Sequence, residues 1–279
     1  MTAIGTAGLH LRTGLRLVRC HGLSPRRALE PLDERLVFVI GCPRSGTTFL
    51  AGAIGSLSGF VDLGEVAPLK AAIPELQRLP EEEAARRIHG LLAVTRRLGL
   101  VGGRRAVEQT PETAFVAAAA GAAFPRACFV HIVRDGRDVV CSLLDRGWLS
   151  AGRGGGDDAG LPYGAGARFW VEPGREAEFS AASDARRAAW AWRCYVSAAR
   201  SAPAGRVRDV RYELLSLNPD AVADSLADFM GVPLEPLADA LRGAHSASVG
   251  RWRRDLTADE LAEVEAECGE LLVELGYLL

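Results

Sequence analysis

The sequence predicts a single α/β domain over residues 35–279, built on a doubly wound parallel sheet flanked by helices. Two short apolar runs, 36–40 and 127–133, have the composition of strands that are buried on both faces of such a sheet. Each run is followed by turn residues and then by apolar residues at helical spacing. Because strands alternate with helices and no repeat or linker interrupts them, one sheet covered by helices is expected.

The expected elements follow one another in a regular order. The strand over 36–40 leads through a turn over 41–46 into a helix with apolar positions from Phe49 to Leu57. We further expect a strand at 60–63, a pair of surface helices over 75–98, a strand at 127–133, a helix with apolar residues between 139 and 144, a helix that begins at Asn218-Pro219 and ends at Gly231, and a final helix that begins with a capping box from Thr257 to Glu260. The glycine-rich segment 147–174 lacks periodicity, which predicts a long loop of the kind that usually serves function.

Residues 1–34 form a basic segment in front of this domain. Five arginines, from Arg12 to Arg27, precede the first acidic residue, Glu30, and they are interleaved with leucine and valine. These arginines interrupt the apolar segment that a signal peptide needs. We therefore expect a basic N-terminal arm or helix, which either packs on the domain or makes peripheral contact with a membrane surface.

Composition limits the class of protein further. With 48% hydrophobic and 24% charged residues, the chain has the balance of a folded globular protein rather than a disordered or collagen-like one. A net charge of -2 argues against nucleic acid as a partner, and no apolar stretch is long enough to span a membrane. The six cysteines include no CxxC pair, which is typical of a reduced compartment and argues against a zinc ribbon or a disulfide scaffold. We expect a cytoplasmic protein.

The turn after the first strand has the chemistry of an anion site. It joins a buried strand to a helix, so free backbone N–H groups lie at the positive end of the helix dipole. Gly41 and Gly46 have the spacing of a phosphate loop, which makes the predicted fold P-loop-like. However, Thr47 stands where nucleoside-triphosphate enzymes have lysine, and the cation, Arg44, lies inside the turn. Because no predicted strand ends in a clear acidic magnesium ligand, we do not expect a magnesium-bound triphosphate.

A second anion site is expected at the end of another strand. Arg134 directly follows the strand at 127–133, and Ser142 lies eight residues further on, about two helical turns along and facing back toward the strand end. Arginine gives planar, multi-donor recognition of anions. Two such sites at the carboxyl ends of strands in one sheet suit a ligand with two separated phosphates.

Two motifs give a resemblance to a known family. Residues 43–50, PRSGTTFL, resemble the 5′-phosphosulfate-binding loop of sulfotransferases, enzymes that use 3′-phosphoadenosine 5′-phosphosulfate (PAPS). Residues 129–142, FVHIVRDGRDVVCS, resemble the 3′-phosphate motif of the same family, including the spacing from arginine to serine. Residues 210–213 resemble the segment whose tyrosine lies beside the adenine, and residues 250–253 resemble a late basic-Trp motif that returns to the nucleotide. The resemblance extends from Val37 to about Asp255, most of the chain.

The resemblance implies roles for particular residues. It implies that the PAPS-binding residues are Arg44, Ser45, Gly46, Thr47 and Thr48 at the phosphosulfate, Arg134, Ser142 and Arg146 at the 3′-phosphate, and Tyr212 and Arg251 elsewhere on the nucleotide. It implies Glu65 as the base that accepts the proton of an acceptor hydroxyl, and Arg44 as its catalytic partner at the phosphosulfate. Arginine and backbone donors are expected to stabilise the transferring sulfuryl group without a metal.

The branch of the family is indicated by the arginine-bearing loop and by Gly64-Glu65, which resemble the tyrosylprotein sulfotransferases and many bacterial relatives. Two departures from that branch stand out. The tyrosylprotein enzymes have two acids after the glycine, whereas Val66 follows Glu65 here. Relatives also often carry a lysine before Thr-Pro or Asp-Pro, where this chain has Gln109, so that contact is either missing or supplied from elsewhere, for instance by Arg44.

The predicted function is therefore transfer of a sulfuryl group from PAPS to a hydroxyl acceptor. A carbohydrate, a lipid or natural product and a phenol all stay open as acceptors, because the specificity surface is expected in segment 147–174. Two alternatives also stay open. One is a P-loop-type kinase or NTPase, which the missing loop lysine disfavours. The other is a catalytically inactive nucleotide-binding relative, which is kept open by Gln109.

Overall fold

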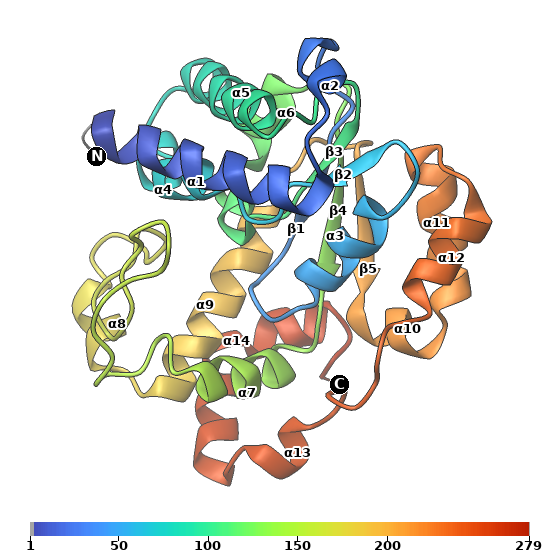
Figure 1. The fold of residues 1–279 in the computed structure, drawn as a ribbon. Coiled ribbons are helices and arrows are strands. Elements are labelled where there is room, and N and C mark those ends of the chain that lie inside the picture. The colour runs from blue at the N-terminus through green and yellow to red at the C-terminus, as the bar shows by residue number, and fades with distance from the viewer. Residues whose placement is uncertain (1–2, 279) are drawn as a thin grey trace.

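The computed structural model describes residues 3–278, and a parallel sheet lies at the centre of the molecule (Figure 1). The sheet has five strands in the order β2-β3-β1-β4-β5. The strands are β1 (Val37–Ile40), β2 (Phe60–Asp62), β3 (Arg105–Glu108), β4 (Cys128–Val133) and β5 (Val207–Arg211). From β1 the chain builds β2 and β3 on one side and then β4 and β5 on the other, so the sheet is doubly wound and the predicted fold class is confirmed.

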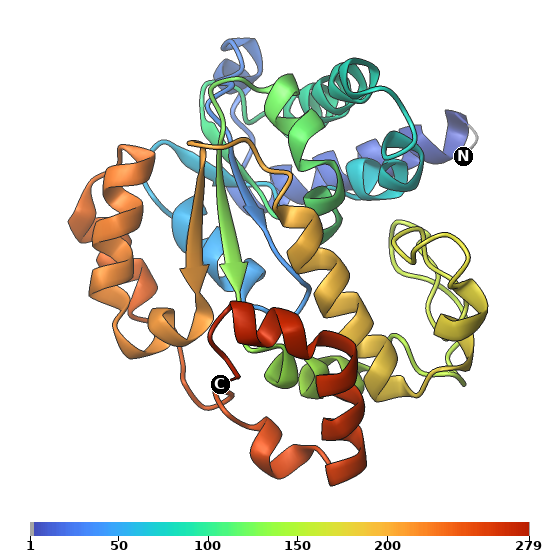
Figure 2. The ribbon, with the colours of Figure 1, turned by 180° about the vertical axis from the view of Figure 1, so that it is seen from behind.

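Helices cover both faces of the sheet (Figure 2). One face carries α3 (Thr47–Gly55), α10 (Tyr212–Leu217), α11 (Pro219–Met230) and α12 (Leu234–Leu241). The other carries α1 (Ala3–His21), α4 (Ala67–Leu76), α5 (Glu81–Leu98), the 3-10 helix η1 (Pro111–Val116), α6 (Ala117–Ala123), α7 (Gly136–Arg146), α9 (Asp184–Ala199) and α14 (Ala258–Glu274). The short helices α2 (Pro25–Leu29), α8 (Glu176–Ala181) and α13 (Trp252–Asp255) belong to the connections between these layers.

Strand β1 shows how the sequence builds two cores. Its side chains are fully buried and alternate between the faces of the sheet. Phe38 and Ile40 pack with the α4–α9 side, whereas Val37 and Val39 pack with α3 and α11. A continuous apolar run is therefore required here, which is why this strand could be predicted from the sequence.

Most expected elements are present, but one expected element is wrong and one strand was not predicted. The pair of helices over 75–98 is wrong: α5 alone spans most of that range, and its partner α4 begins at Ala67, in a stretch with too few charges to show the pattern. Strand β3 was not expected, because Arg105 and Glu108 at its ends leave no apolar run. Tyr212 begins α10, directly after the last residue of β5.

The N-terminal helix α1 packs across α5 and α4 (Figure 1). Leu17 is buried in that contact, whereas Leu11 and Leu15 are about half exposed. None of the helices within residues 3–278 is long and apolar enough to cross a membrane.

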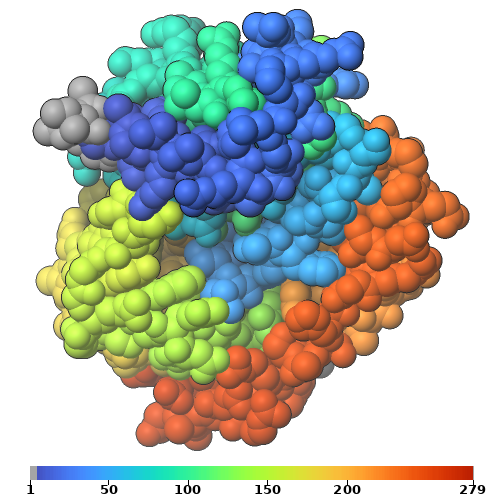
Figure 3. Space-filling view, in the orientation of Figure 1, coloured from blue at the N-terminus to red at the C-terminus, as the bar shows by residue number. Residues whose placement is uncertain are grey.

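The glycine-rich segment 147–174 carries turns and one isolated bridge, between Gly156 and Pro162. Its tip folds back on itself through a bond from the Asp157 amide to the Leu161 carbonyl oxygen, 2.8 Å long. The loop reaches α1, where Arg12 and Asp158 form an ion pair of 3.4 Å. In Figure 3 its yellow-green surface borders the blue N-terminal helix, and a hollow separates it from the segment after β1.

Candidate active site

The turns after β1 and β4 meet because the two strands are neighbours in the sheet. In the first turn, Arg44 has a left-handed backbone with φ of 75°. Gly46 has φ of 97°, and a Cβ atom there would lie 2.7 Å from Cδ2 of Tyr212. Glycine is therefore required at this position both for its conformation and for the close approach of the tyrosine ring. The first backbone hydrogen bond of α3 runs from the Leu50 amide to the Gly46 carbonyl oxygen. The amides just before Leu50 therefore have no partner within the helix and lie at its N-terminal end.

A cavity of about 550 Å³ lies over these turns. Nine of the ten residues expected to bind the nucleotide line it: Arg44, Gly46, Thr47, Thr48, Arg134, Ser142, Arg146, Tyr212 and Arg251. The tenth, Ser45, lies behind the turn, with a buried side chain and an amide that donates to the Cys42 carbonyl oxygen over 3.1 Å. We refer to this cavity as the arginine pocket.

The two turns are joined by direct hydrogen bonds. Arg134 Nη1 donates to the Arg44 carbonyl oxygen over 3.1 Å, and Arg44 Nε donates to Ser142 Oγ over 3.0 Å. The Arg134 guanidinium also stacks 4.6 Å from the centre of the Tyr212 ring. The motif residues that are separated in sequence thus form one network at the carboxyl ends of β1 and β4.

The arginine pocket concentrates positive charge. Burial lowers the pKa of Arg44, and repulsion from Arg146 and Arg134 lowers it further. Arg146 donates no side-chain hydrogen bond to any residue within 3–278. Arg251 differs, because Asp145 and Asp255 bind its guanidinium and raise its pKa above the usual range. Arg134 lies 3.9 Å from Asp138, so its charge is partly balanced, whereas Arg44 and Arg146 have no ion-pair partner within residues 3–278. These guanidinium groups fit an anion, and the cavity has the size of a small-molecule site.

A second cavity of about 530 Å³ lies on the other side of the same turn. Cys42 and Pro43 line it, whereas the next residue, Arg44, lines the arginine pocket. The α7 helix is shared in the same way, since Leu143 faces the second cavity and Ser142 the first. Glu65, the expected base, is part of this second cavity, which we call the aromatic pocket after its lining of Trp148, Tyr163, Phe169, Trp170 and Tyr195.

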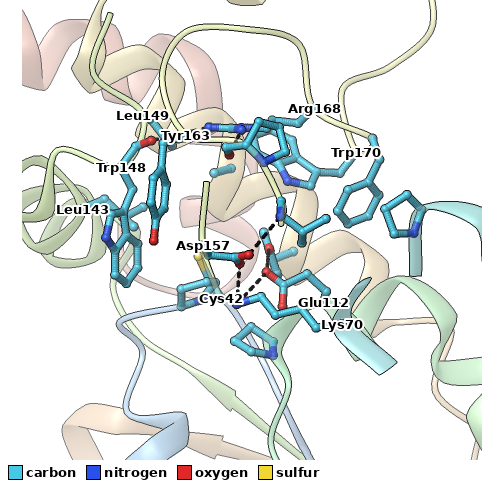
Figure 4. A pocket seen from close by; sticks show the side chains of 18 of the residues that line it. Cys42, Lys70, Glu112, Leu143, Trp148, Leu149, Asp157, Tyr163, Arg168 and Trp170 are labelled. Carbon is cyan, nitrogen blue, oxygen red and sulfur yellow. Dashed lines mark hydrogen bonds and ion pairs between the residues drawn. The ribbon is translucent and has the colours of Figure 1, made fainter. Parts of the chain in front are cut away.

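An ion-pair cluster lies at the polar end of the aromatic pocket (Figure 4). Lys70 Nζ, on α4, lies 2.7 Å from Glu65 Oε2, 2.9 Å from Asp157 Oδ2 and 3.8 Å from Glu112 Oε1. Burial alone would lower the pKa of Lys70, but Glu112 and Glu65 outweigh it and raise the pKa above its usual range. Burial raises the pKa of Glu112 to about 7, despite the opposing effect of Lys70. The lysine is therefore a fixed cation that orients Glu65 and anchors the loop that carries Asp157.

The Lys70 cluster was missed by the motif analysis, although the sequence carries a signal for the lysine. Lys70 is the only lysine in the chain: the other 32 of the 33 basic residues are arginine. A lysine differs from arginine in being a compact point charge. The use of the single lysine inside a pocket therefore indicates a position that requires a compact cation and not a planar guanidinium. Gln109, where relatives often have lysine, is buried, and its carboxamide oxygen accepts no hydrogen bond from any described residue.

The turn that carries Glu65 is held from two directions. Gly64 has φ of 61°, its amide donates to Asp62 over 2.7 Å, and Arg16 of α1 donates to the Glu65 carbonyl oxygen over 3.1 Å. On the other side, the Val66 amide donates to Thr110 Oγ1 over 2.9 Å. The N-terminal helix and the end of β3 therefore both position the expected base.

The fold and these two pockets define a P-loop-like α/β protein with an arginine-lined cavity at the strand ends. The chain belongs to the sulfotransferase family, whose family model matches residues 93–236. No curated protein matches the sequence.

The fold is also that of solved sulfotransferases. A sulfotransferase domain from the curacin biosynthetic pathway is 16% identical, with a TM-score of 0.53 over 87% of this chain and 98% of that domain. Sulfotransferase STF9 from Mycobacterium avium is 14% identical, with a TM-score of 0.52 over 98% of this chain and 86% of that one. Membership in this family favours the predicted transferase over the kinase or NTPase alternative.

Proposed function

We propose that this protein transfers a sulfuryl group from PAPS to the hydroxyl of a small acceptor. The observation that carries the proposal is the arginine pocket, where the turns after two adjacent strands and the end of α7 bring Arg44, Arg134 and Arg146 together around one cavity. PAPS carries phosphate groups at both ends of its ribose, so two anion sites a short distance apart fit it. Bound there, PAPS supplies the sulfuryl group as an activated phosphosulfate anhydride.

The residues divide into two roles within the arginine pocket. Arg44 and the open amides before Leu50 would hold the phosphosulfate, at the positive end of α3. Arg134, Ser142 and Arg146 would hold the 3′-phosphate, with Arg146 supplying a guanidinium that has no hydrogen-bond or ion-pair partner within residues 3–278. Arg44 bonds to Ser142, so binding at one site is coupled to the geometry of the other.

Glu65 is the group that takes the proton. The acceptor oxygen forms a bond to sulfur while the bond from sulfur to the phosphate oxygen breaks, and the acceptor proton moves to the Glu65 carboxylate. The 3′,5′-bisphosphate of adenosine leaves with the electron pair. Lys70 and Arg16 fix the orientation of Glu65. Less conformational entropy is then lost when the carboxylate is aligned for reaction. We place this activity in the cytoplasm, where the six unpaired cysteines remain thiols.

The proposal is tested by calorimetry with 3′,5′-bisphosphoadenosine and by transfer of radiolabelled sulfate from PAPS to pooled hydroxylated compounds. Glu65→Gln should lower kcat about 10²–10⁴-fold and leave nucleotide affinity nearly unchanged. Glu75→Gln, an exposed glutamate on α4, is the matched control and should behave as wild type. Absence of binding heat would refute the nucleotide site, whereas nucleotide binding without any transfer would indicate a catalytically inactive relative.

A further inference from the structure

We propose that the aromatic pocket is the acceptor site and that it takes a flat, largely apolar and uncharged alcohol or phenol. This inference rests on the proposed sulfuryl transfer and names its acceptor class, which the sequence left open among carbohydrates, lipids, natural products and phenols. Three features of the pocket carry it: its position beside the arginine pocket, its apolar wall and the sign of its charge.

Position makes the aromatic pocket the place from which an acceptor reaches the donor. The two cavities lie on opposite sides of residues 42–44, and successive residues of α7 face one and then the other. A hydroxyl beside Glu65 therefore lies next to the turn that carries Arg44. The volume of about 530 Å³ falls in the range that encloses a small organic molecule.

The wall of the aromatic pocket is apolar and firmly packed. Tyr195 and Phe169 both contact Phe115 edge to face, with ring centres 4.8 Å and 5.2 Å apart. Trp170 packs in the same way against Phe179 at 5.3 Å. The rings that line the cavity are thus supported from behind, which favours a preformed flat slot. A carbohydrate would leave several hydroxyl groups without partners against this wall, at a cost for each one.

Charge in the aromatic pocket is predominantly negative. Four carboxyl groups line it, from Glu65, Glu112, Asp157 and Asp158, against the cations of Lys70 and Arg168 and of Arg12 on α1, which pairs with Asp158. Lys70 is bound by carboxylates, and Arg168 donates to the Gly164 carbonyl oxygen of its own loop over 3.1 Å. Arg168 keeps its charge, but backbone carbonyl oxygens of its own loop hold its guanidinium, so an anionic acceptor would meet more carboxylates than available cations and be repelled. The donor, in contrast, is anionic, so the two pockets select ligands of different charge.

The test compares three probes of known chemistry on the full chain. We expect 2-naphthol to bind with a Kd below about 1 mM and to be sulfated, while 2-naphthoate, of similar size but anionic, binds about tenfold more weakly or worse. Methyl glucoside should give no measurable binding. Affinities are measured by quenching of tryptophan fluorescence and by calorimetry, each with and without 3′,5′-bisphosphoadenosine.

Leu161→Trp tests the location, since this loop residue lines the cavity and a larger side chain would fill it. The variant should lose naphthol affinity about tenfold while keeping its heat of nucleotide binding, which also shows that it is folded. Leu217→Trp, at a side chain that is 69% exposed on α10, is the matched control and should change neither affinity.

The outcomes separate the two proposals. If the nucleotide binds and naphthoate or the glucoside binds as tightly as naphthol, the acceptor class is wrong while the sulfotransferase proposal stands. If Leu161→Trp keeps full naphthol affinity, the location is wrong. If naphthol binds and the nucleotide gives no heat, the sulfuryl-transfer proposal fails and the aromatic pocket is left as a site of another function.

Discussion

Glu108 allows a quantitative test of how the Glu65 turn is supported. Its side chain is fully buried at the end of β3, where Oε1 accepts from the Thr110 amide over 2.8 Å and Oε2 accepts from Thr113 Oγ1 over 3.0 Å. Thr110 in turn accepts from the Val66 amide. Burial raises the pKa of Glu108 from 4.5 to about 8, against the opposing hydrogen bonds. The carboxyl group is therefore neutral in the folded protein at pH 6, but ionised in the unfolded chain.

A raised pKa of this kind favours the folded state at low pH. The contribution is complete below pH 4.5, declines as the unfolded carboxyl ionises, and stops falling once the pH passes the folded pKa of about 8. Between pH 6 and pH 8 the unfolded carboxyl is already ionised, while the folded one still keeps its proton. At 1.36 kcal/mol per pH unit over roughly two units, Glu108 should lower the free energy of unfolding by about 3 kcal/mol between pH 6 and pH 9.

The substitution Glu108→Gln removes this pH dependence and keeps the shape. The carboxamide oxygen can accept from the Thr110 amide, and its NH₂ group can donate to the hydroxyl of Thr113. Stability is measured by urea unfolding at pH 6 and pH 9, with unchanged m values as a requirement. We expect the free energy of unfolding of the variant, minus that of wild type, to be about 2–3 kcal/mol larger at pH 9 than at pH 6, because only wild type loses this stability.

The exposed Glu82 on α5 supplies the control, because Glu82→Gln should follow the wild-type pH dependence. If Glu108→Gln and wild type lose the same stability between pH 6 and pH 9, then Glu108 does not hold its proton in the folded state. The reasoning from burial would then be refuted.

Three further perturbations test the two pockets. Lys70→Met leaves its carboxylates without a cation and should cost about 3 kcal/mol of unfolding free energy at pH 8. The cost should be smaller at pH 6, because loss of Lys70 raises the pKa of Glu112 above its wild-type value of about 7 and the carboxyl group then takes up a proton easily. An equal loss at both pH values in urea unfolding would contradict this. Gly46→Ala should reduce nucleotide affinity at least tenfold by calorimetry, because its methyl would meet a ring 2.7 Å away, whereas Gly59→Ala, also at positive φ but facing open space, should leave affinity unchanged. Arg146→Ala should lower nucleotide affinity about tenfold with little change in Tm, and the difference from wild type should shrink between about 50 mM and 500 mM salt; a difference independent of salt would show that Arg146 does not act through its charge.

Local sequence was sufficient to predict the strands and turns that form the arginine pocket. The run at 36–40 is apolar throughout, and the run at 127–133 is apolar except at His131, whose ring pairs with Asp209, so a buried parallel strand accommodates both. The capping box from Thr257 to Glu260 begins α14 as expected, because its reciprocal hydrogen bonds span only three residues. Where the pattern was weak, as in the short β3 with charged ends, the strand was missed.

The arginine pocket could be anticipated for the same reason. Strand, turn and helix are contiguous in each motif, and parallel strands bring their carboxyl ends to one edge, so the motifs alone predict that Arg44 and Arg134 lie near one another. Their nucleotide-binding roles stay predictions. The burial of Ser45 behind the turn, and the pairing of Arg251 with Asp145 and Asp255, are not visible in the motifs.

Periodicity and the fixed spacings within each motif are enough to define the doubly wound α/β fold and the edge of the sheet where two arginine-bearing turns meet. The aromatic pocket, the Lys70 cluster and the path of segment 147–174 depend instead on contacts between distant parts of the chain. A loop without periodicity is placed by those contacts alone, as Asp157 is by Lys70. The charge state of a buried group such as Glu112 likewise depends on neighbours from other elements, and no local pattern records them.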